Sequence, residues 1–155
     1  MQAITKADTA DMRELISFEV RDQAFCVDIH CVREIRGWSA VTPMPQAPSF
    51  VCGIVNLRGT MLPIVDLGDR LGYGRTVASA RHAIIVVQGG HQLLGLLVDG
   101  VSEILSVDAA GIQVPPTLGS EYADDMVYGM LPAAENIITI LGVDNIIGSG
   151  LPQAA

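Results

Sequence analysis

Six side chains in this sequence have the strongest potential for chemistry, either as nucleophiles and bases or as metal ligands. They are Cys26, Cys31, Cys52, His30, His82 and His91. A zinc site takes several Cys or His ligands, and a catalytic thiol needs a base. Cys26 and Cys31 lack a second close pair, and no histidine stands at a recognisable catalytic spacing. We predict buried structural thiols, with no catalytic residues and no bound metal. A thiol- or metal-dependent enzyme is the alternative.

Other common catalytic motifs are missing from the sequence. It has no Gly-x-Ser-x-Gly and no Walker loop. Three aspartates, Asp66, Asp99 and Asp144, follow apolar runs, but no second carboxylate pairs with them. Asp66 and Asp144 are predicted to begin helical turns by accepting backbone hydrogen bonds, and Asp99-Gly100 is typical of a turn. The pattern predicts a binding module that needs no cofactor.

One arginine stands where a binding residue is expected. Residues 56–67 read Asn-Leu-Arg-Gly-Thr-Met-Leu-Pro-Ile-Val-Asp-Leu, so Arg58 and Gly59 form a turn between two apolar strands. A rigid hairpin that presents a cation on its turn is well suited to bind another molecule. The alternative is a solubilising charge or a surface salt bridge of little energetic value.

The strands around this turn have counterparts in the second half of the chain. Residues 14–35 and 83–104 both read as an apolar strand, a polar turn and a second apolar strand, and both end in Val-x-Glu-Ile. Residues 51–72 and 127–148 form a second pair, and each ends in a stretch fit for a helical turn. We interpret the chain as two copies of one β unit. The alternative is that apolar hairpins resemble one another by chance.

The repeat predicts a fold. Its approximate halves, 14–72 and 82–148, are of a size that suggests two small β-barrels packed together. The runs 83–87 and 93–98 are almost continuously apolar, which predicts burial on both faces between the barrels.

The two copies differ at the turn. The position that matches Gly53 is Gly129, but the position that matches Arg58 is Ala134. If Arg58 only supported its barrel, the second barrel should have a similar residue. The difference therefore favours a special role for Arg58.

Composition limits the partners. The chain has 155 residues, of which 50% are apolar and 17% charged, which is typical of a folded domain with a real core. The net charge of −8 and the lack of a basic stripe argue against nucleic acid or an anionic membrane as a partner. No apolar run is long enough to span a bilayer, and the start lacks the apolar core of a signal peptide. We expect a cytoplasmic protein without direct membrane insertion.

These motifs together resemble a known family. Residues 32–37 read Val-Arg-Glu-Ile-Arg-Gly, and residues 53–59 read Gly-Ile-Val-Asn-Leu-Arg-Gly. Residues 63–67 read Pro-Ile-Val-Asp-Leu, and residues 98–101 read Val-Asp-Gly-Val. In order and spacing the set resembles CheW, the adaptor that joins chemoreceptors to the histidine kinase CheA. The chain is identified as a single CheW-like domain over 1–155, with flexible ends at 1–12 and 149–155.

The resemblance implies a mainly all-β fold of two SH3-like five-stranded barrels with short helical turns. It also implies a receptor-binding site that contains Arg58, Glu34, Val32, Asn56 and Val101, while the kinase-binding residues stay unknown. The implied partners are the cytoplasmic tip of a chemoreceptor and the regulatory domain of CheA, in membrane-associated receptor arrays. A second possibility is an array-building protein that binds only kinase barrels.

Overall fold

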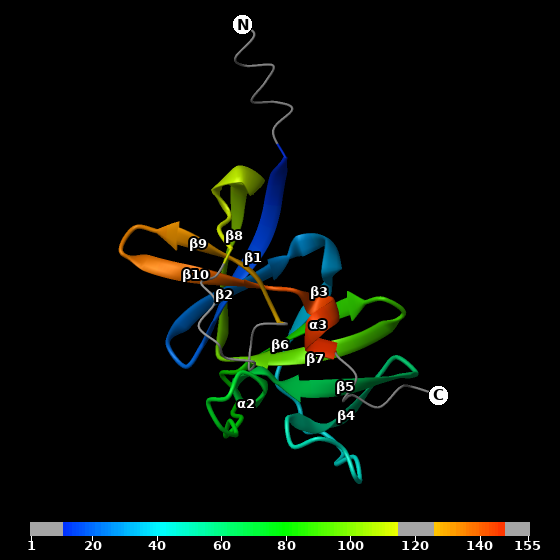
Figure 1. The fold of residues 1–155 in the computed structure, drawn as a ribbon. Coiled ribbons are helices and arrows are strands. Elements are labelled where there is room, and N and C mark those ends of the chain that lie inside the picture. The colour runs from blue at the N-terminus through cyan, green and yellow to red at the C-terminus, as the bar shows by residue number, and fades with distance from the viewer. Residues whose placement is uncertain (1–10, 115–125, 148–155) are drawn as a thin grey trace, which may run out of the picture.

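The computed structural model describes residues 11–114 and 126–147, which fold into two five-stranded β-sheets (Figure 1). The predicted mainly all-β class is confirmed. One sheet has the order β8-β1-β2-β10-β9, and the other has the order β3-β6-β7-β5-β4. We name them the β9–β10 barrel and the β4–β5 barrel, after one hairpin of each.

The β9–β10 barrel contains β1 (Met12–Val20), β2 (Gln23–Asp28), β8 (Gly100–Asp108), β9 (Val127–Ala133) and β10 (Asn136–Leu141). The β4–β5 barrel contains β3 (Val32–Gly37), β4 (Val51–Leu57), β5 (Thr60–Asp66), β6 (Ala83–Gly89) and β7 (Gln92–Val98). Neighbouring strands are antiparallel, except that β10 pairs with β2 and β5 pairs with β7 in parallel.

The two sheets have the same strand order when each of β1 to β5 is matched with the strand five places later in the chain. Each barrel nevertheless takes strands from both halves. The β9–β10 barrel takes β1 and β2 from the first half and β8 to β10 from the second, and the β4–β5 barrel has the reverse mixture. The two barrels therefore do not correspond to the predicted halves 14–72 and 82–148, because the halves exchange their first two strands.

Among the described residues, each sheet is closed by one isolated bridge between an edge strand and the segment that follows the other edge strand. After β3 the chain returns to β4, where Thr42 and Ile54 exchange hydrogen bonds of 2.9 and 2.8 Å. After β8 it returns to β9, where Gln113 and Met130 exchange two bonds of 2.8 Å. Closure satisfies edge groups that would otherwise be open to pairing with other chains.

The main core lies between the two sheets. Phe18 and Val27 of one sheet share a buried cluster with Ile85 and Leu96 of the other. Alternate side chains of β6 and β7, namely Ile84, Val86 and Leu97, enter a second cluster on the opposite face. The prediction that these strands are buried on both faces is confirmed.

The helices are short. They are α2 (Leu67–Arg70), α3 (Val143–Ile147) and the 3-10 turns Ile29–Cys31 and Ala109–Gly111. As predicted, Asp66 precedes α2 and accepts a hydrogen bond from the backbone N–H of Asp69. Asp144 instead lies in the first turn of α3. No helix in the described part of the chain could cross a membrane.

The ends of the chain were predicted to be flexible over 1–12 and 149–155. Met12 begins β1 and pairs with Asp108, and the carbonyl of Asp11 accepts a 2.8 Å hydrogen bond from Ala109 N–H. These two residues are therefore part of the fold. Residues 1–10 and 149–155 lie outside the described residues.

Candidate functional site: an exposed ion pair at a hairpin turn

The hairpin turn between β4 and β5 consists of Arg58 and Gly59. Leu57 pairs with Thr60, so the loop has two residues, and their φ angles of 50° and 89° match a type I′ turn. The side-chain oxygen of Asn56 accepts a 2.8 Å hydrogen bond from Gly59 N–H. Asn56 therefore fixes the turn that carries Arg58. A non-glycine residue pays a conformational cost at positive φ, so the arginine occupies a strained position.

Arg58 is bonded to a carboxylate on another strand. Its Nη2 donates a 2.6 Å hydrogen bond to Oε1 of Glu34 on β3, while Nη1 of Arg36 lies 3.7 Å from the other oxygen. The side chain of Arg58 is 72% exposed and that of Glu34 is 31% exposed. The hydrogen bond from Arg58 lowers the pKa of Glu34, and the charges of Arg58 and Arg36 add to this effect. The pair joins edge strand β3 to the turn beside edge strand β4.

The other predicted site residues are not all close to this pair. Val32 lies on the same strand as Glu34, half-buried against the main core. Val101 lies on β8, in the other barrel, and is 37% exposed. The structure therefore brings Arg58, Glu34 and Asn56 together and places Val101 on a different sheet. Any surface that uses both valines has to span both barrels.

Met61 is a surface residue beside the turn that sequence reasoning missed. It lies directly across from Asn56 in the β4–β5 ladder, so the two side chains share a face. It is 61% exposed. In the sequence it begins an apolar run that reads as buried strand, and only the hairpin register shows that it points outward. The register could have been derived from the two-residue turn.

The three thiols are poor nucleophiles. Burial raises the pKa of Cys26 to about 12 and that of Cys52 to about 11, and it also raises the pKa of Cys31. The imidazole of His30 contacts Asp28, not a thiol. No group of three or more His, Cys, Asp or Glu side chains within residues 11–114 and 126–147 is arranged to hold a metal ion.

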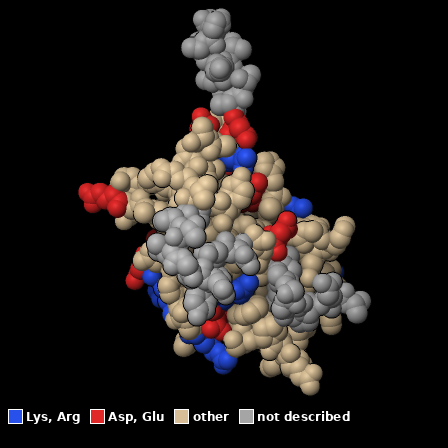
Figure 2. Space-filling model, in the orientation of Figure 1, with Lys and Arg blue, Asp and Glu red and all other residues tan. Residues whose placement is uncertain are grey.

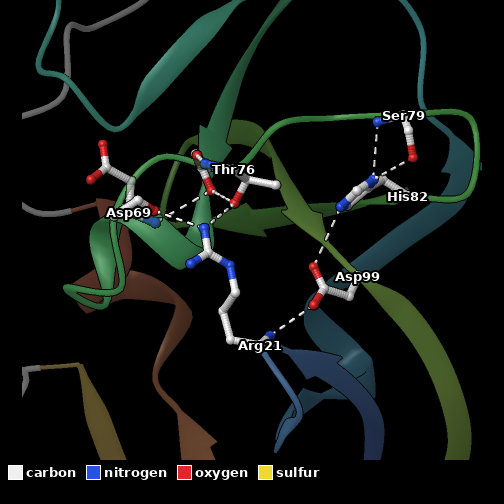
Figure 3. A network of polar contacts seen from close by, with 8 residues as sticks. Arg21, Asp69, Thr76, Ser79, His82 and Asp99 are labelled. Carbon is white, nitrogen blue, oxygen red and sulfur yellow. Dashed lines mark hydrogen bonds and ion pairs between the residues drawn. The ribbon is translucent and has the colours of Figure 1, made fainter.

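A serine, a histidine and an aspartate do meet, although no sequence motif marks them. The backbone N–H of Ser79 lies 3.0 Å and its hydroxyl 3.1 Å from Nδ1 of His82, and Nε2 lies 3.5 Å from Asp99 (Figure 3). The backbone N–H of Ser79 donates to Nδ1, so that nitrogen is already engaged as an acceptor. Asp99 in turn accepts a 2.7 Å bond from Arg21 N–H. This arrangement fastens loops to each other.

Two closed five-stranded β-barrels that share a core place the protein in the class of SH3-like barrel modules. A family model described as the CheW-like domain matches residues 14–150, and the chain belongs to this family.

Several named proteins resemble this chain over most of its length. The chain is 46% identical to the chemotaxis protein CheW of Rhizobium meliloti over 92% of each chain. It is 31% identical to protein FrzA of Myxococcus xanthus, over 92% of this chain and 89% of that one. The solved structure of the scaffolding protein TtCheW from Thermoanaerobacter tengcongensis matches with a TM-score of 0.79 and 30% identity, over 87% of each chain.

CheW-like proteins are scaffolds without enzymatic activity, so the alternative of a thiol- or metal-dependent enzyme is set aside. The chain has the role of an adaptor in chemotaxis signalling.

Proposed function

We propose that this protein couples chemoreceptors to the histidine kinase CheA in membrane-associated arrays. It would bind the cytoplasmic tip of a receptor with one surface and the regulatory domain of the kinase with another. One observation carries the receptor assignment. Arg58 is fixed on a strained turn by Asn56 and Glu34, yet most of its side chain faces solvent. A purely structural arginine would gain little from such a position.

The geometry suggests how the site would work. Of the N–H groups of the Arg58 guanidinium, only Nη2 donates a hydrogen bond to a described residue. The other N–H groups are left for a partner. A receptor tip is a helical hairpin, so a helix would lie along the barrel surface with a carboxylate or carbonyl against Arg58. Glu34 would hold the guanidinium in place, and Val32, Asn56 and Val101 would extend the contact toward the second barrel. A charge-assisted hydrogen bond of this kind contributes about 1.5–3 kcal/mol, or roughly tenfold or more in affinity.

The test is a three-component pull-down with a receptor fragment, the kinase and variants of this protein. Arg58→Glu is expected to abolish receptor capture while the circular dichroism spectrum and kinase capture stay unchanged. Arg33→Glu is the matched control, because Arg33 is an exposed arginine on β3 that contacts Gln88 and His30. Receptor capture at the wild-type level by folded Arg58→Glu would contradict the site assignment. Capture of kinase but never of receptor by the wild-type protein would favour the array-building alternative.

A charge swap separates two roles of Arg58. The double variant Glu34→Arg with Arg58→Glu can re-form an ion pair of reversed polarity at the same place. If Arg58 contacts the receptor, this variant stays inactive in receptor capture. If the ion pair only holds the hairpin in shape, the swap restores capture that Arg58→Glu alone has lost.

A further inference from the structure

The loop at 72–82, between α2 and β6, has no regular structure but is fastened near its start. The buried carboxylate of Asp66 accepts bonds of 2.7 Å from both the N–H and the hydroxyl of Thr76. The guanidinium of Arg21, from the other barrel, donates to the carbonyls of Tyr73 and Gly74 at 2.9 and 3.0 Å. Figure 3 shows Arg21 reaching from the β1–β2 turn to Thr76. The first part of the loop is thus held by both barrels.

The end of the same loop is held by a second set of bonds. His82 is buried, accepts the N–H of Ser79, contacts Asp99, and through its carbonyl accepts a 3.2 Å bond from Trp38 N–H. Buried polar groups with all these partners resist local opening. The conformation of the loop between the two anchors is therefore fixed by the fold, although the loop contains no helix or strand.

Several side chains of the loop face solvent. Val77 is 87% exposed, Tyr73 is 43% exposed, and the arginines Arg75 and Arg81 are both exposed. Beside the loop is a cavity of about 370 Å³. Its lining includes Trp38, Ser49, Arg75, Thr76 and Ala78. A rigid loop that holds a valine and a tyrosine in water next to a hollow has the features of a contact surface.

The charge of the loop itself is opposite to that of the whole chain. The net charge of the chain is −8, yet residues 72–82 contain Arg75 and Arg81 and no Asp or Glu. The neighbouring helix α2 and the β1–β2 turn add Arg70 and Arg21 together with Asp69 and Asp22, so the excess of positive charge comes from the loop. Figure 2 shows basic side chains, with acidic ones among them, over the end of the molecule where α2 lies. Neither Arg75 nor Arg81 forms an ion pair with a described residue, and the Asp66 carboxylate is buried and occupied.

We propose that loop 72–82 and the cavity beside it form a docking surface for a protein face that places carboxylates around an apolar contact. Arg75 and Arg81 would meet the carboxylates, and Val77 would enter the apolar part. The inference rests on the proposed function and names its second partner, the regulatory domain of the kinase. Arg58 precedes β5 and α2 follows it, so the seven-residue strand separates the two surfaces by roughly 20 Å. Receptor and kinase can then bind at the same time.

The experiment measures binding of a labelled kinase regulatory domain and, separately, of a receptor tip fragment. The double variant Arg75→Glu with Arg81→Glu is expected to weaken regulatory-domain binding at least about tenfold and to leave receptor binding unchanged. With Arg75→Gln and Arg81→Gln, binding should become less sensitive to salt. Val77→Ser should weaken binding as well. Val114→Ser is its matched control, because Val114 is 86% exposed and lies outside the loop.

Each outcome decides the inference. The inference is overturned if the regulatory domain still binds both the charge-reversed variant and Val77→Ser at the wild-type level. It is also overturned if these variants lose receptor binding alone, because the loop then serves the other partner. An equal loss from Val114→Ser overturns the role of Val77. If the wild-type protein binds neither the regulatory domain nor the receptor fragment, the proposed function itself fails. The wild-type measurement alone shows this. All four side chains are exposed, so folding is expected to be unchanged, and a thermal melt of each variant confirms this.

Discussion

The β4–β5 and β9–β10 hairpins occupy equivalent places in the two barrels, but among the described residues only the β4–β5 turn carries an ion pair. Both have two-residue loops, and Arg58 and Ala134 both have positive φ, at 50° and 56°. The next residue differs. Gly59 has a φ of 89°, whereas Glu135 is not among the described residues with a positive φ, so the two turns differ in type. Both hairpins thus have a two-residue loop with a positive φ at its first position, and the described residues place an arginine–glutamate pair at only one of the two turns.

The carboxylate partner of Arg58, Glu34, shows the same contrast between the two copies. The repeat matches Glu34 with Glu103, but the counterparts of its two cations, Arg36 and Arg58, are Leu105 and Ala134. Glu103 forms no ion pair with a residue that the structure describes. A carboxylate at this place is therefore compatible with the fold without any arginine. The arginines of the β4–β5 barrel are not needed to close a barrel of this kind, which supports a role in binding.

The cavities of the two barrels differ in the same direction. The cavity beside loop 72–82 is lined in part by Cys52, Asp66 and Leu97. A second cavity, of about 170 Å³, lies at the equivalent place in the other barrel. Its lining contains the repeat counterparts of these three residues, in the same order Tyr128, Gly142 and Asp28. The first cavity has polar walls from Asp66 and Arg75. The second is lined mainly by apolar residues such as Leu15, Ile140 and Val143. The cavity of the β4–β5 barrel is thus the more polar of the two, although Arg13 and Asp28 also border the second cavity.

The largest expected effect concerns the residues that close the barrels. Gly53 has a φ of 155°, and a Cβ there would overlap the backbone of Thr42, whereas a Cβ at Gly129 would overlap the Cγ2 methyl of Ile112, a side chain that can shift more readily than backbone. Gly53→Ala should therefore lower the free energy of unfolding by about 3 kcal/mol and Gly129→Ala by about 1–2 kcal/mol. Urea denaturation measures both. Equal losses would show that the two closures are energetically alike.

This closure illustrates what the sequence could predict and what it could not. The match of Gly53 with Gly129 was visible, and so were the apolar strands, the turn at Arg58 and the pairing of β6 with β7. The exchange of strands between halves was not, because hydrophobic pattern fixes which residues form strands but not which distant strands pair. Likewise Glu34 was placed in the site only by family resemblance, and the contact of Arg21 with loop 72–82 joins residues with no pattern in common. Such long-range polar contacts depend on the packing of the whole fold.

A smaller effect is expected from replacing the strained turn residues. Ala134→Gly removes a side chain from positive φ, which should raise the free energy of unfolding by roughly 0.5 kcal/mol once the added chain entropy of glycine is counted. Arg58→Gly relieves the same strain but loses the bond to Glu34, so its gain should be smaller. Only Arg58→Gly should weaken receptor binding. If Ala134→Gly weakens receptor binding equally, the contrast between the hairpins does not report a binding site.

The smallest effect is a pH dependence that Arg58 confers on Glu34. The pKa of Glu34 is lowered from 4.5 in the folded protein, chiefly by the hydrogen bond from Arg58. A lowered pKa stabilises the fold above the ordinary pKa, and this contribution is lost as the pH falls through the folded value. In Arg58→Gln the pKa of Glu34 should rise toward 4.5, with Arg36 still holding it slightly low. NMR titration of the Glu34 carboxyl measures this shift directly.

The difference in unfolding free energy between wild type and Arg58→Gln should shrink as the pH falls below about 4.5. An unchanged Glu34 titration in the variant would mean that the ion pair does not persist in solution, and Arg58 would then present its charge without a fixed orientation.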